Sequence, residues 1–191
     1  MIKAIIVDCF GVLTTDHWKQ FVATLPAEQQ GPVHQLNHAY DQGHLSKADF
    51  LAAVQELTGQ VSRYTDKLLD NETAKNTQLL DYIAELRSRG YKIALLSNVA
   101  TIWIREEFLT PTEQQLFDVF IFSYEVGLVK PEPKIYQLTV ERLGLEADEC
   151  VMIDDIERYC AVAREQGLQA IVYDNFAQCK TELERVLSSR A

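Results

Sequence analysis

The chain has 191 residues and a formal net charge of -10, a length that fits one domain with an elaboration. The acidic balance argues against nucleic acid or an anionic membrane as the main partner, although positive groups can still gather around a small anionic substrate. No segment approaches the roughly 20 apolar residues that a membrane span needs.

Short apolar runs alternate with helical patterns along the chain. The first run, residues 3–7 (KAIIV), is typical of a strand that is covered on both faces. Similar runs predict four more strands, at residues 91–96, 119–122, 150–153 and 169–173. Apolar residues at helical spacing, ending near glycines, predict helices between them, at residues 77–89, 133–143 and 157–166. This alternation predicts an α/β fold with a Rossmann-like, doubly wound parallel sheet.

The connection between the first two strands is far longer than one crossover needs, and structureless loops of that size are rare. Helical patterns fill it, at residues 16–25, 32–40, 46–58 and 61–69. Ser46 with Asp49 three residues later resembles a capping box. We therefore expect a small helical cap at residues 15–75, inserted after the first strand of a core domain made of residues 1–14 and 76–191.

Chemically useful side chains follow the first four predicted strands. In chain order they are Asp8, then Ser97 and Asn98, then Ser123 with Lys130 just beyond, then Asp154 and Asp155. Polar residues after strands are commonly turn formers or helix caps, so each position alone is weak. In an open parallel sheet, however, ligands bind outside the carboxyl ends of the strands. Acids, a hydroxyl and a lysine at separate strand ends therefore favour a common site.

Four sequence motifs resemble those of the haloacid dehalogenase-like (HAD) hydrolases. They are VDCFGVL (7–13), LLSN (95–98), GLVKPEPKIY (127–136) and VMIDDIERYCAVAREQG (151–167), in the order and at the spacing typical of that family. The phrase YDQGHLSKADF (40–50) also resembles the cap of the branch that contains glucose-1-phosphatase-like sugar phosphatases and the phosphatase domain of epoxide hydrolase. The resemblance covers nearly the whole chain.

The resemblance implies roles for the residues that bind phosphate. Asp8 would be the nucleophile that forms an aspartyl phosphate, a known covalent strategy for carboxylates. Ser97 and the backbone amide of Asn98 would bind phosphate oxygens. Lys130 would neutralise both the phosphate and the nucleophile.

The resemblance also implies a magnesium site made of the Asp8 carboxylate, the backbone carbonyl of Phe10 and Asp155, with Asp154 orienting Lys130. Two carboxylates and a phosphate within about 4 Å of one another repel by several kcal/mol per charge pair at an effective dielectric constant near 20. A hard dication with oxygen ligands removes that repulsion, and Mg²⁺ suits such a site.

Two positions depart from the family pattern. Phe10 stands where the phosphatases usually have a second aspartate, and loss of a general acid typically lowers rates by about 10² to 10⁴. Tyr159 stands where the fourth motif commonly has Asn or Asp near the metal. We therefore expect slow turnover of poor leaving groups and a bias toward activated esters such as sugar 1-phosphates and acyl phosphates. Asp16 or His17 offers an alternative proton source from the cap side.

Three functions remain open. The leading one is a magnesium-dependent phosphatase of a small phosphorylated metabolite. The second is a catalytically impaired HAD-fold protein that binds a phosphorylated ligand or a protein partner, as Phe10 and Tyr159 suggest. The third is a 2-haloacid dehalogenase, a branch that has tyrosine in place of Phe10 but lacks the Asp154–Asp155 pair.

The cysteines show neither a C-x-x-C pair nor zinc-like spacing, which predicts reduced, mostly buried thiols and a cytoplasmic location. They are Cys9, Cys150, Cys160 and Cys179. Asp8 interrupts the first apolar run, so we expect no signal peptide there. We expect the protein to be a monomer or a homodimer, with no nucleic acid or membrane partner.

Overall fold

A computed structural model describes residues 1–61 and 74–189 and contains a five-stranded, wholly parallel sheet. Its strands are β1 (Ala4–Val7), β2 (Lys92–Ser97), β3 (Val119–Phe122), β4 (Cys150–Asp154) and β5 (Gln169–Val172). Their order in the sheet is β3-β2-β1-β4-β5, with β1 at the centre. Strands added on both sides of β1 make a doubly wound sheet, which confirms the predicted fold class.

Every residue of β1 is buried, which explains its continuous apolar sequence. Val7 pairs with Leu95 of β2 and with Ile153 of β4, so these three strands end within two residues of one level of the sheet. The ladder continues for one more residue, since the Asp8 N–H donates to the Ile153 carbonyl at 3.0 Å. The register therefore brings the residues that follow β1, β2 and β4 to one edge.

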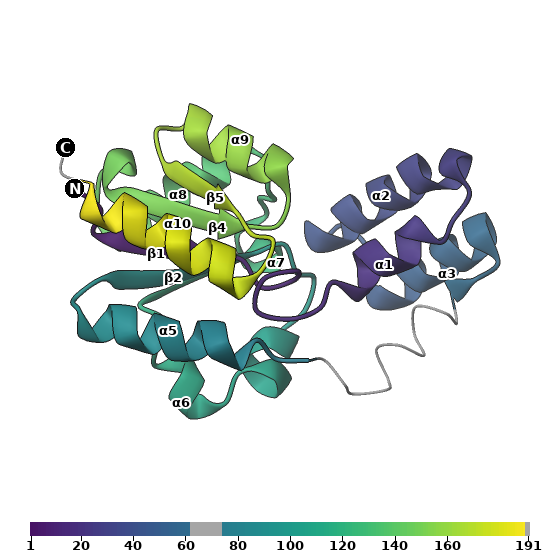
Figure 1. Ribbon diagram of the computed structural model, residues 1–191. Helices are drawn as coiled ribbons and strands as arrows, with labels where there is room; N and C mark the ends of the chain where they lie inside the picture. Colours follow the sequence, from purple (N-terminus) through teal and green to yellow (C-terminus); the bar gives the residue numbers. More distant parts are fainter. Residues whose placement is uncertain (62–73, 190–191) are drawn as a thin grey trace.

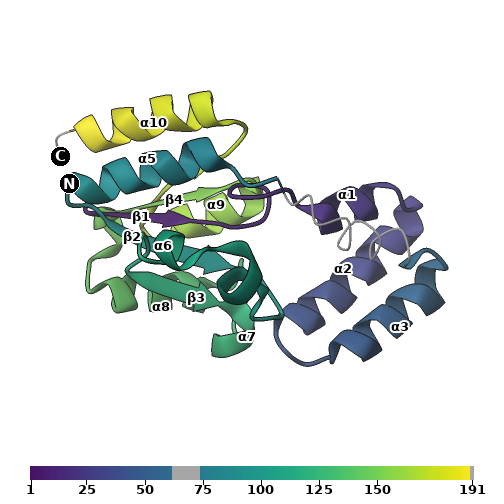
Figure 2. The same ribbon diagram turned by 90° about the horizontal axis from the view of Figure 1, so that it is seen from below.

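Two apolar clusters cover the two faces of the sheet. On one face lie α5 (Thr77–Ser88) and α10 (Phe176–Ser188), and on the other lie α8 (Pro133–Leu143) and α9 (Glu157–Glu165) (Figure 2). Short helical segments occupy the connections. They are a π-helical turn at Ile104–Phe108, α6 (Pro111–Gln114), α7 (Ser123–Val126) and a 3₁₀ turn at Ala147–Glu149.

Three further helices lie together beside the sheet (Figure 1). They are α1 (His17–Ala23), α2 (Ala27–Asp41) and α3 (Lys47–Thr58). They share an apolar cluster of their own, in which the rings of Tyr40 and Phe50 stack with centroids 4.4 Å apart. Because this cluster contains no residue of the sheet, the helical group has a core separate from the two layers that cover the strands.

Helix α2 starts at Ala27, five residues before the predicted start at residue 32. Proline disfavours a helical conformation in the preceding residue, chiefly through a clash with that residue's Cβ. Gly31 has no Cβ, so the helix continues through Pro32. Helix α3 begins as predicted, because the hydroxyl of Ser46 accepts the N–H of Asp49 at 3.1 Å. The helix predicted over residues 61–69 lies, apart from Val61, outside the described residues.

The chain crosses between the sheet and the helical group at two neighbouring places. The N–H of Asn76 donates to the carbonyl of Leu13 at 2.8 Å, and its side-chain amide donates to the carbonyl of Val12 at 2.9 Å. The same amide donates to the hydroxyl of Tyr173 at 2.7 Å. The outgoing and returning segments are thus tied to each other and to the end of β5.

All four cysteines are buried and free, as predicted. Within residues 1–61 and 74–189, the helices are too short or too polar to cross a membrane.

Candidate active site

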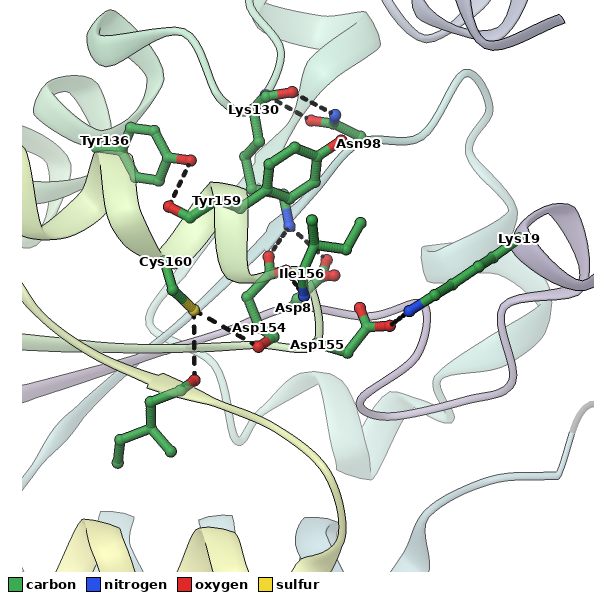
Figure 3. Close-up of polar contacts among 11 residues, drawn as sticks. Asp8, Lys19, Asn98, Lys130, Tyr136, Asp154, Asp155, Ile156, Tyr159 and Cys160 are labelled. Atoms are coloured by element: carbon green, nitrogen blue, oxygen red, sulfur yellow. Dashed lines mark hydrogen bonds and ion pairs between the residues drawn. The ribbon is translucent and has the colours of Figure 1, made fainter. Parts of the chain in front are cut away.

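Three of the predicted site residues form a buried ionic cluster at the carboxyl edge of the sheet (Figure 3). The ammonium of Lys130 lies 2.8 Å from Oδ1 of Asp8 and 2.6 Å from Oδ2 of Asp154. The side chains of Lys130 and Asp154 are 1% and 0% exposed. Because isolated buried charges are strongly unfavourable, the three groups depend on one another.

Burial alone would lower the pKa of Lys130, but the carboxylates of Asp154 and Asp8 outweigh burial and raise this pKa above its ordinary value. The lysine is therefore a permanent cation at neutral pH. Burial raises the pKa of the Asp8 carboxyl well above its ordinary value, and the Lys130 ammonium opposes that shift. A further positive charge near Asp8 favours the carboxylate form that a nucleophile needs.

The loop that carries Lys130 is attached to the end of β2 by the side chain of Asn98. The amide of Asn98 donates to the carbonyl of Lys130 at 3.0 Å, and its oxygen accepts the N–H of Lys130 at 2.8 Å. The sequence predicted a role for the backbone of Asn98 but not this use of its side chain. The ring of Tyr159 lies 5.2 Å from the Lys130 ammonium, close enough for a cation–π contact.

Asp8, Asp154 and Asp155 could together hold a metal ion, since each offers a carboxylate oxygen within 4.8 Å of the other two. Oxygen ligands of this kind suit a hard divalent cation. Both oxygens of Asp154 already accept hydrogen bonds, from Lys130 and from the N–H of Ile156 at 2.9 Å. Asp8 and Asp155 are therefore the carboxylates best able to bind a cation.

Asp155 carries the clearest sign of such a site. Its Oδ1 is buried and has no hydrogen-bond partner among the described residues. Its other oxygen, Oδ2, lies 2.6 Å from the ammonium of Lys19 on α1. A buried carboxylate oxygen without a donor is unfavourable unless a cation or water binds it, so the donor set fits a metal ion.

The loop after Asp8 passes very close to Asp155 at Gly11. This glycine has φ of +85°, and a Cβ built on it would lie 2.4 Å from Cγ of Asp155. Only glycine fits there without displacing the acid. The ring of Phe10 stacks on that of Trp103, with centroids 5.9 Å apart. The Phe10 side chain is thus part of an aromatic contact and supplies no acid.

Two hydroxyls that follow strands behave differently. The Oγ of Ser97 is buried and finds no hydrogen-bond partner within the described part of the chain, which suits a group that awaits a ligand. The Oγ of Ser123 accepts the N–H of Val99 at 2.9 Å and donates to its carbonyl at 3.0 Å. The hydroxyl of Ser123 therefore fastens the loop after β2, and among the described residues its hydrogen bonds go to Val99 rather than to the acid–lysine cluster.

The start of α1 lies beside Asp155, one of the acids that could hold a metal ion. The Asp16 carboxylate caps this helix by accepting the N–H of Lys19 at 2.8 Å, and burial raises its pKa. Asp16, Lys19 and Asp155 line a cavity of about 440 Å³. Nδ1 of His17 is buried without a partner among residues 1–61 and 74–189.

One acid at the end of α2 has no role in the sequence-based expectations. Asp41 is buried, accepts a hydrogen bond from Asn37 at 2.8 Å, and has its pKa raised by burial to about 7. The next residue, Gln42, donates to Glu132 at 3.0 Å, next to the loop of Lys130. Asp41 lies in the stretch YDQGHLSKADF (40–50) that resembles a family cap, but that resemblance does not indicate that its side chain is buried.

A doubly wound sheet with a buried acid–lysine cluster at its carboxyl edge and helices inserted after the central strand defines an α/β enzyme domain. The model of the haloacid dehalogenase-like hydrolase family matches residues 2–167, and the chain belongs to that family. The family predicted from the four motifs is therefore confirmed.

Relatives of the chain include a full-length match and a partial one. Phosphatase MT3486 of Mycobacterium tuberculosis is 26% identical, over 98% of this chain and 94% of its own length. Acyl-CoA dehydrogenase family member 10 of mouse is 32% identical over 66% of this chain, which spans only 12% of that protein.

Solved structures agree on the fold. A HAD family enzyme from Bacteroides thetaiotaomicron has a TM-score of 0.69 and 25% identity, covering 94% of this chain and 98% of that one. A HAD-like hydrolase from Porphyromonas gingivalis has a TM-score of 0.74 and 24% identity over the whole of both chains.

Proposed function

We propose that this hydrolase is a magnesium-dependent phosphatase of small phosphorylated metabolites that acts through an aspartyl phosphate on Asp8. The observation that carries the proposal is the buried Asp8–Lys130–Asp154 cluster beside the unpartnered oxygen of Asp155. Relatives support it: MT3486 is a phosphatase, and the B. thetaiotaomicron enzyme forms a magnesium complex in a structure 25% identical to this chain.

In this mechanism a carboxylate oxygen of Asp8 attacks phosphorus, and the bond from phosphorus to the leaving oxygen breaks. Lys130, the Ser97 hydroxyl and the Asn98 N–H bind the phosphate oxygens. Asp8, Asp155 and the Phe10 carbonyl would hold a Mg²⁺ ion, which would supply charge compensation between the nucleophile and the phosphate. Attack of water on the aspartyl phosphate then regenerates Asp8 and releases inorganic phosphate.

The leaving group limits which esters react quickly. Phe10 has no proton to give, and its ring is engaged with Trp103. An anomeric or acyl oxygen leaves with less protonation than an ordinary alkoxide, so sugar 1-phosphates and acyl phosphates are the favoured substrates. Asp16 lines the cavity beside Asp155 and is the candidate for a substitute acid, because burial raises the pKa of its carboxyl.

Residues 15–75 act as a cap over a core of residues 1–14 and 76–191. The separate apolar cluster of α1–α3 supports this division. Contacts from Gln42 to Glu132 and from Lys19 to Asp155 support a cap that lies beside the site.

A second candidate is a binding protein with little turnover, favoured by Phe10 in place of an acid. The phosphatase and the binding protein are separated by assays on a panel of four esters, p-nitrophenyl phosphate, acetyl phosphate, glucose 1-phosphate and glucose 6-phosphate. The wild type and the Asp8→Asn variant are each assayed with and without Mg²⁺. Turnover that needs both Mg²⁺ and Asp8 supports the phosphatase, whereas no turnover of any ester supports the binding protein.

The same panel tests the leaving-group argument. Glucose 1-phosphate should be cleaved faster than glucose 6-phosphate, and equal rates would contradict the role assigned to Phe10. The variant Phe10→Asp should raise the rate on glucose 6-phosphate more than the rate on acetyl phosphate.

A further inference from the structure

A lysine of the cap reaches across to the metal-binding acids of the core. Nζ of Lys19 lies 2.6 Å from Oδ2 of Asp155, although the two residues are 136 positions apart (Figure 3). The Lys19 side chain is 57% exposed, whereas that of Asp155 is 10% exposed. The lysine therefore approaches from the open side of the site and can leave it without crossing the protein interior.

The start of α1 holds Lys19 in place. The Asp16 carboxylate accepts the N–H of Lys19 at 2.8 Å, which fixes the first turn of the helix next to the site. The backbone of Lys19 is thus positioned, and only the side chain is free to change conformer.

The charges of the site explain why a cation is favoured at this position. Three carboxylates offer oxygens within 4.8 Å of one another, and the Lys130 ammonium forms ion pairs with two of them, Asp8 and Asp154. Lys19 supplies the positive charge that the third carboxylate, Asp155, requires. A divalent cation bound by Asp155 would supply the same compensation and would repel an ammonium at this distance.

We propose that Lys19 and the divalent cation compete for Asp155, so that Lys19 sets the metal affinity of the site and is released from the core when the cation binds. The inference rests on the proposed function only in taking Asp155 as a metal ligand. The released ammonium stays at the wall of the 440 Å³ cavity that Lys19 shares with Gln20, Lys75 and Asp155. Metal binding thereby frees a cap cation beside Asp155 in this cavity.

Magnesium titration by isothermal calorimetry tests the competition without any substrate. Lys19→Met should bind Mg²⁺ about two- to fivefold more tightly than the wild type, which is the range expected for an exposed ion pair. Lys19→Arg keeps the charge and should stay near the wild type. Lys47→Met, which removes an exposed charge at the start of α3, is the matched control and should leave the affinity unchanged.

Asp155→Asn separates the two ideas. If Asp155→Asn abolishes Mg²⁺ binding and Lys19→Met binds Mg²⁺ no more tightly than the wild type, the competition is refuted and the metal site stands. If neither the wild type nor Lys19→Met binds Mg²⁺, both the competition and the metal site of the proposed function are refuted. Thermal melts of each variant without Mg²⁺ establish that it is folded before titration.

Discussion

Replacement of Lys130 by methionine should destabilise the fold severely, independently of any catalytic role. The variant keeps the volume of the side chain but leaves Asp8 and Asp154 buried without the ammonium that lies 2.8 and 2.6 Å from them. Removing one partner of a buried ion pair typically costs about 3–5 kcal/mol. That is a large part of the roughly 5–15 kcal/mol that stabilises an ordinary domain.

Denaturant and thermal unfolding measure this loss, which corresponds to a fall in Tm of about 6–20 °C for a chain of this size. Lys134→Met, which removes an exposed charge at the start of α8, is the control and should change little. The double variant Lys130→Met with Asp154→Asn should recover part of the stability. The stability that Lys130→Met loses relative to the wild type should be smaller at pH 5 than at pH 8. The buried carboxyls of this variant bind protons more readily in the folded state than in the unfolded state, so a lower pH favours its fold. A loss below about 1 kcal/mol would refute the reasoning.

Three other substitutions probe the site. Gly11→Ala should lower the free energy of unfolding by about 1–3 kcal/mol in urea melts, because a Cβ at φ of +85° would meet Asp155. It should also weaken Mg²⁺ binding, and a wild-type affinity for Mg²⁺ would contradict the close approach. Ser97→Ala should leave Tm unchanged, since Oγ has no partner among the described residues, but should weaken binding of inorganic phosphate in calorimetry. The pKa of the Asp41 carboxyl is about 7 in the folded protein and near 3.9 in the unfolded chain. Burial of this carboxyl therefore costs no stability below about pH 4, and the cost grows as the pH rises to 7. Asp41→Asn should therefore raise stability by about 2–4 kcal/mol at pH 8 and by little at pH 4 in urea melts, and an equal gain at both would count against this.

The sheet was predictable from sequence because its strands are short, largely apolar and bounded by helices with clear stops. Helix α8 matches its predicted span, and Gly144 after it adopts φ of +66°, the conformation that ends helices. Helix α10 is not among the predicted elements, although Asn175 caps it by accepting the N–H of Gln178 at 3.0 Å. Its start could have been found from that asparagine.

The site was predictable only where it depends on strand ends. Asp8 and Asp154 meet because the register of β1 and β4 brings their ends together, and Lys130 reaches both acids from a loop that Asn98 holds. The contact of Lys19 with Asp155 depends on how an inserted helix docks onto the sheet, and no local pattern encodes that placement. The burial of Asp41 has the same origin.

The hydrogen bonds of Asn76 to Val12 and Leu13 bear on how such a chain can vary in length. The segment between Leu13 and Asn76 leaves the core and rejoins it at neighbouring residues. The core therefore holds the two ends of this segment together, as the ends of a loop. The free energy of closing a flexible loop grows only with the logarithm of its length, about 0.6 kcal/mol for each doubling. Insertions of very different size can therefore be exchanged at this point while strand order and register stay the same. The size of the insertion and the stability of the core can then change independently, because they are encoded in different stretches of the chain.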